Sequence, residues 1–292
     1  MKIIILYGPT GIGKTATSLR LAKQFDAEII SCDSMQIYKY LDIGSAKIMP
    51  NDMMGIKHHL IDFVMPNQSF SVYDFVTHCK QAIGEIKSRG KNVIIVGGTG
   101  LYIKALVENY NLGEIDSSSR EEFNSLSNDE LRKIIEDANI SLKNGDAHNR
   151  TRLLRYAQLA INKSKVTKQL NYEDYTIFGF VCDRQKLYDK INKRVDEMID
   201  KGLVKEAEFI YKSYGENVQC FKAIGYKELL PYLKGETEIV SCIELIKQHS
   251  RNYAKRQFTF MNQFKNIIKV NADDFDTCYK QITKVLEEEN NE

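Results

Sequence analysis

The sequence lacks several features that would place it in a class at once. Its six cysteines are scattered, with no C-x-x-C pair and no cysteine–histidine cluster, which argues against a zinc site and is typical of reduced thiols. No apolar run approaches the ~18–20 residues of a membrane-spanning helix. The first strand pattern begins at residue 3, so we expect no signal peptide and a cytoplasmic protein without a membrane partner. The net charge of +2 neither requires nor excludes nucleic acid.

A glycine-rich motif stands near the start of the chain. It reads Gly8-Pro9-Thr10-Gly11-Ile12-Gly13-Lys14-Thr15 and fits the pattern G-x-x-x-x-G-K-[S/T]. A β-branched apolar segment precedes it and a helical pattern follows, which is the context of a phosphate-binding loop, or P-loop, rather than a mere turn. Backbone N–H groups and the helix dipole favour an anion there. Lys14 would add a charge and Thr15 a ligand for Mg²⁺; alone, the motif predicts nucleotide phosphates such as those of ATP.

Alternating strand and helix patterns predict an α/β fold, a P-loop NTPase-like parallel sheet flanked by helices. Strands are expected over 3–7, 28–31, 92–96, 176–182 and, at an edge, 267–270. Helices are expected over 71–89, with Ser71 as N-cap, and over 184–200, 203–213, 225–234 and 237–264. We expect an α/β core over 1–110, a small helical insertion that contacts the substrate over 111–148, and a return to the core sheet with C-terminal helices over 149–292.

Polar residues follow two more of the expected strands. The strand over 28–31 is followed by Asp33-Ser34, and ligands of doubly wound sheets sit at the carboxyl ends of strands. If this strand lies beside the first, Asp33 faces the P-loop, where a carboxylate can bind Mg²⁺ or accept a proton. The alternative is that Asp33 only caps the next helix. Gly97-Gly98-Thr99-Gly100 either lets backbone approach the same crevice closely or is a bland turn.

The order of these and later motifs resembles that of bacterial tRNA dimethylallyltransferases, also called tRNA isopentenyltransferases. The matching segments are 8–15, Glu28 to Tyr38, Asp42-Ile43-Gly44-Ser45-Ala46-Lys47, His58 to Asp62, Gly97 to Tyr102, Arg194-Val195-Asp196, Gly202-Leu203, Ala223 to Glu228, and Ala254-Lys255-Arg256-Gln257. Because they follow one another over nearly the whole chain, the resemblance is far more specific than a P-loop alone.

The resemblance implies the transfer of a dimethylallyl group from dimethylallyl diphosphate to N6 of adenosine 37 in a tRNA. The P-loop would hold the diphosphate of the donor, with Mg²⁺ on Thr15, rather than a transferable phosphoryl group. Asp33 would accept the proton from the adenine amine, and Thr10 and Arg194 would complete the catalytic set. Nothing in the sequence demands more than a monomer.

The resemblance also implies a set of tRNA contacts. They are Asp33, Ser34, Met35, Gln36, Thr99, Arg120, Arg152, Lys222, Ala223, Ile224, Gly225, Tyr226 and Lys227. Further basic residues are either patches for a polyanion or ordinary solvated faces: Arg150, Arg155, Arg251, Lys255 and Arg256. The segment 145–155 departs from the family's usual H-P-N-D-x-x-R-x-x-R-A-L-E, and Phe260 stands where the family has tryptophan. The first departure bears on the grip on tRNA rather than on the chemistry.

Three other interpretations stay open at this point. A small-molecule kinase would share the P-loop, Lys14 and Thr15, but should add an arginine-rich lid, of which the sequence gives no clear sign. A prenyltransferase acting on free AMP, ADP or ATP would keep the chemistry and change the acceptor; the insertion and the basic helices favour tRNA. A non-enzymatic nucleotide switch or RNA-binding module would leave Asp33 unexplained.

Overall fold

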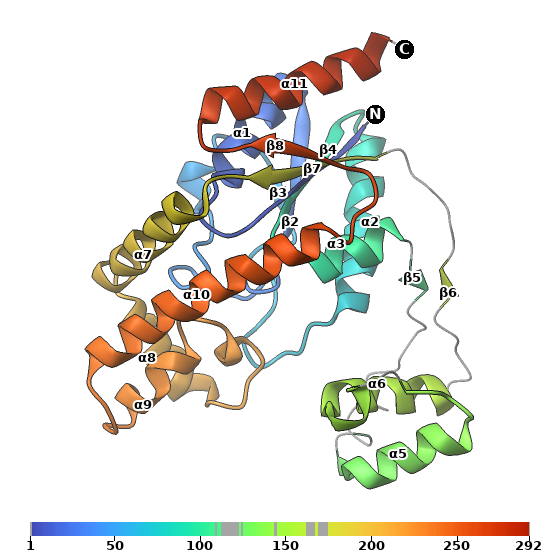
Figure 1. The fold of residues 1–292 in the computed structure, drawn as a ribbon, viewed down its shortest axis with the longest axis vertical. Helices are drawn as coiled ribbons and strands as arrows, with labels where there is room; N and C mark the ends of the chain where they lie inside the picture. Colours follow the sequence, from blue (N-terminus) through green and yellow to red (C-terminus); the bar gives the residue numbers. More distant parts are fainter. Residues whose placement is uncertain are drawn as a thin grey trace. The chain divides into compact units, whose positions relative to one another are not determined.

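The computed structural model describes residues 2–108, 110–111, 123, 125–142, 145–161, 167–168 and 175–291. Six parallel strands form one sheet, in the order β3-β2-β4-β1-β7-β8 (Figure 1). They are β1 (Ile3–Tyr7), β2 (Ala27–Cys32), β3 (His58–His59), β4 (Asn92–Gly97), β7 (Tyr175–Val181) and β8 (Ile267–Asn271). The predicted parallel sheet flanked by helices is therefore confirmed. The two-residue β3 escaped sequence analysis because it is too short to show a period.

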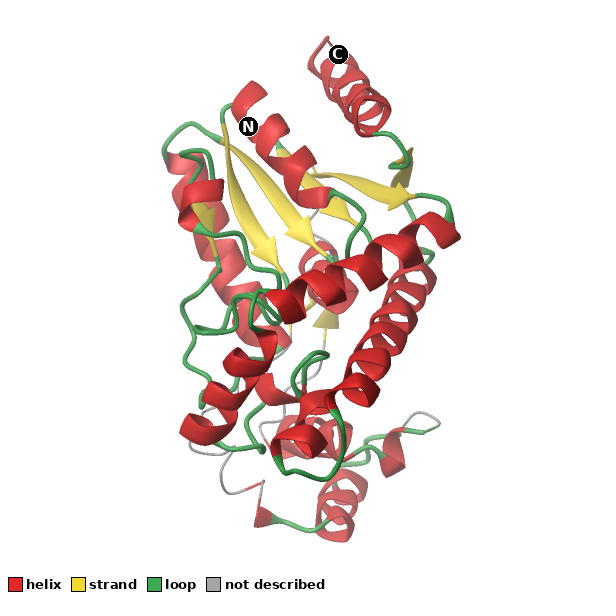
Figure 2. Ribbon diagram, turned by 90° about the vertical axis from the view of Figure 1, so that its left-hand side faces the viewer, coloured by secondary structure: helices red, strands yellow, loops and turns green. Residues whose placement is uncertain are grey.

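The strand order corrects one expectation. The strand that ends at Asp33 does not lie beside the strand that ends at the P-loop, because β4 pairs with both and stands between them. The carboxyl ends of all three strands still point the same way, as the arrowheads in Figure 2 show. Their terminal loops therefore meet at one edge of the sheet.

Helices connect and cover the strands. They are α1 (Lys14–Gln24), α2 (Val72–Ser88), α3 (Gly100–Val107), α7 (Arg184–Asp200), α8 (Leu203–Tyr214), α9 (Leu230–Leu233), α10 (Ile239–Met261) and α11 (Phe275–Asn291), with 3₁₀ turns at Pro50–Asp52, Cys220–Lys222 and Lys227–Leu229. The predicted N-cap of α2 is present: the Ser71 hydroxyl accepts the N–H of Asp74, whose carboxylate accepts the N–H of Ser71. The expected helix over 225–234 is instead a 3₁₀ turn followed by the short α9.

The core of the sheet is apolar on both faces. Ile4 and Leu6 of β1 pack with Leu21 of α1 and Ile282 of α11 in one buried cluster. The alternate residue Ile5 points to the opposite face and is also fully buried. Burial on both faces is why the strand shows an unbroken apolar run rather than alternation. A rigid, doubly covered sheet holds the loops at its carboxyl edge.

Residues 105–172 make up a second compact unit. It contains α5 (Asn128–Asp137), a 3₁₀ turn at Asp146–His148, α6 (Arg150–Ile161), and the antiparallel pair β5 (Tyr110–Asn111) and β6 (Thr167–Lys168). Leu153 and Ala157 of α6 pack on Leu131 and Ile135 of α5. The insertion therefore extends beyond the 111–148 expected from the sequence, because α6 shares its core with α5 instead of joining the sheet. Within the described ranges, no helix is long and apolar enough to cross a bilayer.

Candidate functional site

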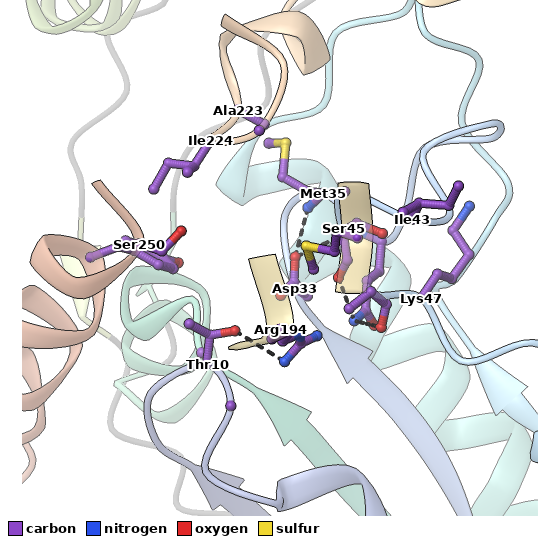
Figure 3. A pocket seen from close by; sticks show the side chains of 18 of the residues that line it. Thr10, Asp33, Met35, Ile43, Ser45, Lys47, Arg194, Ala223, Ile224 and Ser250 are labelled. Atoms are coloured by element: carbon purple, nitrogen blue, oxygen red, sulfur yellow. Dashed lines mark hydrogen bonds between the residues drawn. The ribbon is translucent and has the colours of Figure 1, made fainter. Parts of the chain in front are cut away.

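A cavity of about 1200 Å³ opens at the carboxyl edge of the sheet. Its walls come from the P-loop, the turn after β2, the loop at 42–47, α7, the segment 222–227 and α10, all within the first unit. Figure 3 shows Asp33 between Thr10 and Arg194 on one side and Ala223 and Ile224 on the other. Residues 96–98 at the end of β4 and Glu206 of α8 also line the cavity, so the site gathers residues from many separate stretches of chain.

The P-loop has the geometry of an anion cradle. It runs from the end of β1 to the start of α1, and Gly11 and Gly13 take positive φ angles of 77° and 100° that other residues avoid. A Cβ on Gly8 would lie 2.8 Å from the Cβ of Phe180, so the loop also packs tightly on β7. No side chain caps the N-terminus of α1, which leaves its first N–H groups to a ligand. The interpretation as a mere turn does not account for this arrangement.

Lys14 lies at the buried side of the cradle. Its Nζ donates to the carbonyl oxygens of Gly8 at 2.8 Å and Pro9 at 2.7 Å. Burial lowers the pKa of the Lys14 ammonium to about 7, although the nearby Asp33 carboxylate favours the charged form. A bound anion would add to Asp33 a second negative group that favours the charged form of Lys14.

Arg194 and Thr10, predicted to act together, are in contact. The Arg194 Nη1 atom lies 3.4 Å from the Thr10 hydroxyl and donates to it. Burial lowers the pKa of the Arg194 guanidinium, and Asp33 partly opposes this effect; an arginine nevertheless stays charged. The α7 helix thereby brings a second cation to the cradle.

Asp33 has a local role and also faces the cavity. Its Oδ1 atom accepts the N–H groups of Met35 at 2.9 Å and Gln36 at 3.4 Å, so the carboxylate stabilises a turn rather than a helix. Asp33 lines the cavity and shifts the pKa values of Lys14 and Arg194. The carboxylate therefore lies in the same cavity as the P-loop although β4 stands between the two strands, and the capping alternative accounts for only one of its two oxygens.

The glycines after β4 permit two close approaches. A Cβ on Gly97 would lie 2.0 Å from the carbonyl oxygen of Cys32, and one on Gly98 would lie 2.0 Å from Nε2 of Gln257. Thr99 then accepts the N–H of Ser34 on its hydroxyl at 3.2 Å. Ser34 is one of the residues that line the cavity, so Thr99 holds a lining residue in place through this bond. The segment is thus more than a bland turn.

The predicted tRNA contacts fall into four groups. Asp33, Ser34, Met35, Gln36 and the segment 222–227 line the cavity, although the Tyr226 side chain is fully buried. Thr99 is not among the lining residues but accepts the N–H of Ser34, which is. Arg152 lies in the second unit, where it forms an ion pair with the buried Asp146. Arg120 lies outside the described residues.

Sequence analysis missed three supports of the site. Gln257 of α10 accepts the N–H of Thr10 at 3.0 Å and donates to the carbonyl of Gly98 at 2.9 Å, so one buried amide joins the P-loop to the β4 loop. Burial raises the pKa of the Tyr253 hydroxyl one turn earlier, and the neighbouring Asp33 adds to this. Glu206 of α8 accepts hydrogen bonds from the loop at 42–44 and from Tyr226. Gln257 stood in a recognised motif without a role, whereas a lone glutamate in a helix gives no signal.

Comparisons with known proteins agree with this architecture. A family model described as IPP transferase matches residues 36–264. A tRNA dimethylallyltransferase from Finegoldia magna is 43% identical over 291 residues, covering 94% of this chain and 92% of that protein. The crystal structure of a full-length tRNA isopentenylpyrophosphate transferase from Bacillus halodurans superposes with a TM-score of 0.75 at 36% identity, covering 98% of this chain and 95% of the other.

A eukaryotic dimethylallyltransferase, solved in snapshots of its action on tRNA, superposes with a TM-score of 0.77 at 26% identity. That match covers 97% of this chain and 78% of the eukaryotic one. The motifs, the fold and these relatives lead to one conclusion: the chain belongs to the IPP transferase family.

Proposed function

We propose that this chain is a tRNA dimethylallyltransferase. It transfers the dimethylallyl group of dimethylallyl diphosphate to N6 of adenosine 37 in tRNA and releases diphosphate. Its relatives carry this name or that of tRNA isopentenyltransferase. The observation that carries the proposal is that an anion cradle and a carboxylate, Asp33, open on one cavity. We further propose that it acts as a monomer in the cytoplasm.

The cradle serves the leaving group in this proposal. The bond between the allylic carbon and the bridging oxygen breaks as negative charge develops on the diphosphate. The N–H groups at the start of α1, the ammonium of Lys14 and the guanidinium of Arg194 all lie at the P-loop and would stabilise that charge. Because these groups are fixed before the reaction, little reorganisation is needed when the charge appears.

Asp33 serves the acceptor. The N6 amine of adenine is a weak nucleophile, so placing it against the allylic carbon matters as much as basicity. As the new C–N bond forms, the proton leaves N6 for the Asp33 carboxylate. The Oδ1 atom is fixed by Met35 and Gln36, which holds the carboxylate in place for this step.

Magnesium fits the oxygen donors of the cavity. Thr15 and Asp33 both line it, and Mg²⁺ is usually held by one or two protein oxygens together with substrate phosphates. Bound Mg²⁺ would neutralise charge on the departing diphosphate.

The tRNA would approach from the side of Ser34, Met35 and the segment 222–227. A base in an anticodon loop must be turned out of its stack to enter a cavity of this kind. Lys222 and Lys227 line the cavity and would bind backbone phosphates. We propose that Arg120 and Arg152 of the second unit add further contacts.

One assay separates the candidate functions. The protein is incubated with Mg²⁺ and dimethylallyl diphosphate labelled in the prenyl group, together with an anticodon stem-loop carrying A36 and A37, or AMP, or ATP with hydroxyl acceptors. Label in the stem-loop supports the proposal. Label only in AMP, phosphate transfer from ATP without prenyl transfer, or binding without any product would contradict it, because these outcomes belong to an adenylate prenyltransferase, a kinase and a binding module.

A further inference from the structure

One carboxylate joins two separate segments of the cavity wall. Glu206 lies in the first turn of α8, and its Oε2 atom accepts the backbone N–H groups of Asp42 at 2.9 Å and Ile43 at 2.8 Å. Its Oε1 atom accepts the N–H of Gly44 at 2.9 Å and the hydroxyl of Tyr226 at 2.6 Å. Four donors therefore converge on one carboxyl group, and a carboxylate accepts stronger hydrogen bonds than a neutral acceptor does.

The Tyr226 ring is fitted against the same loop. The ring has no exposed surface, and a Cβ on Gly44 would lie 2.6 Å from its atoms. Gly225, at a positive φ of 99°, donates its N–H to the buried Glu228 at 2.8 Å. The Tyr226 side chain thus packs between the loop at 42–44 and α8. The neighbouring Ala223, Ile224 and Lys227 line the cavity.

This network is separate from the one that holds the P-loop. Glu206 contacts the loop at 42–44 and Tyr226, whereas Gln257 contacts Thr10 and the carbonyl of Gly98. The two halves of the cavity are consequently fixed by different side chains. A change in one network should leave the other half in place.

We propose that Glu206 is a positioning residue for the tRNA side of the cavity. It keeps the loop at 42–44 and the segment 223–227 in the arrangement that receives the acceptor, and it leaves the diphosphate cradle unaffected. The inference rests on the proposed function. All four of its hydrogen bonds go to protein groups, so Glu206 acts through the residues it holds and not on the reacting atoms.

The test replaces Glu206 by glutamine. This change keeps the volume of the side chain but replaces one accepting oxygen with an NH₂ group, which cannot accept the hydrogen bonds of the donors that face it. The matched control is Glu208→Gln on the same helix, where the exposed carboxylate pairs only with Lys212 at 2.6 Å among the described ion pairs. We expect Glu206→Gln to raise the KM for the stem-loop about tenfold. The KM for dimethylallyl diphosphate should stay within about twofold of the wild-type value, and Glu208→Gln should match wild type in both.

Tyr226→Phe provides a milder second variant, since it removes the hydroxyl that donates to Glu206 and keeps the buried ring. We expect it to raise the stem-loop KM about threefold, and the double variant to show less than the sum of the two effects because both lose the same bond. Unchanged stem-loop KM in either folded variant, equal increases for both substrates, or strict additivity would overturn the inference. If Glu206→Gln does not fold, Tyr226→Phe decides alone.

Direct binding of a fluorescent stem-loop keeps the two proposals apart. If the wild type transfers label and both variants bind the stem-loop as it does, the positioning role of Glu206 fails and the proposed function stands. If the wild type transfers no label to any stem-loop, the proposed function fails first.

Discussion

At the level of single residues, Asp33 combines a structural role in a turn with the catalytic role that we propose for it. Oδ1 fixes the turn after β2, and the side chain borders the cavity that contains Lys14 and Arg194. Sequence reasoning could identify the residue because an aspartate directly after a buried strand is a readable pattern. It could not tell that the turn bond and the cavity-facing position coexist, since that depends on how the chain folds back at Met35 and Gln36.

Replacing Asp33 by asparagine separates these two roles. The amide oxygen can still accept the Met35 N–H, but the base is lost and the negative charge beside Lys14 disappears. We expect turnover to fall about 10²–10⁴-fold while affinity for dimethylallyl diphosphate is kept or increased. Single-turnover transfer and equilibrium binding of the diphosphate measure the two quantities. Loss of affinity with normal turnover would show that Asp33 is not the base.

Lys14→Ala should behave differently from the Asp33 variant. Lys14 contacts the P-loop carbonyls of Gly8 and Pro9 and would also bind the diphosphate, in both the ground state and the transition state. We therefore expect both diphosphate affinity and turnover to fall by at least about tenfold each. The same two measurements apply, and a change confined to turnover would place Lys14 outside the diphosphate site.

At the scale of elements, the long apolar strands and capped helices were predictable, and their order in space was not. The unbroken run of β1 and the Ser71 capping box of α2 are local signals that sequence carries directly. The position of β4 between β1 and β2 is set by crossover connections, which leave no local pattern. The 3₁₀ turn at Lys227–Leu229 was also expected as part of a longer helix, because a single turn of either helix type gives the same short sequence pattern.

A buried ion-pair cluster ties α2 to the sheet. The Glu28 carboxylate accepts Arg89 Nε at 3.0 Å and Nη2 at 2.7 Å, and contacts His59 Nε2 at 2.6 Å. Burial alone would raise the pKa of Glu28, but hydrogen bonds from Arg89 and His59 outweigh it and lower the pKa to about 2. Glu28 therefore links three elements, β2, β3 and the end of α2.

The sign of the pH effect follows from that lowered pKa. The unfolded chain binds more protons than the folded one between pH 4.5 and about 2, so the stabilisation by Glu28 is present above that window and is lost as pH falls through it. We expect Glu28→Gln to lower the free energy of unfolding by about 1–2 kcal/mol at pH 7, a value reduced for the partly exposed Arg89. Its stability should fall less steeply below pH 4.5 than that of wild type.

Urea unfolding at pH 7 and at several acidic values checks this prediction. Glu208→Gln on α8, where the exposed carboxylate pairs with Lys212, is the control and should follow wild type. Parallel acid profiles for wild type and Glu28→Gln would refute a paired, ionised Glu28.

At the scale of the whole molecule, the chain divides into a P-loop unit and an inserted unit with its own core. The P-loop, Asp33 and the glycines after β4 were predictable because each of them directly follows a strand, whereas Arg194 and the segment 222–227 were found only through the family resemblance. Neither signal could reveal Glu206 or the role of Gln257, whose importance lies in contacts between segments far apart in sequence. The C-terminal boundary of the insertion was expected too early in the chain, because sequence patterns do not show that α6 packs on α5.

A core substitution in the inserted unit tests this division. Leu153→Ala removes a fully buried side chain from a small cluster and should destabilise that unit by about 2–4 kcal/mol. We expect faster proteolytic cleavage within residues 105–172 and unchanged affinity for dimethylallyl diphosphate. Limited proteolysis with mapped cleavage sites and equilibrium binding measure both effects. Loss of diphosphate affinity would mean that the units do not behave independently.

The central claim is that the P-loop holds a leaving group while Asp33 receives the acceptor. The most direct measurement is the stoichiometry of one turnover with dimethylallyl diphosphate, Mg²⁺ and an A37 stem-loop, following both products. We expect one equivalent of inorganic diphosphate to be released for each dimethylallyl group found by mass spectrometry on the base at position 37. A stem-loop with G37 should release none. Diphosphate release without a prenylated base, or transfer of a phosphoryl group from ATP in its place, would show that the P-loop does not hold the leaving group of a prenyl transfer.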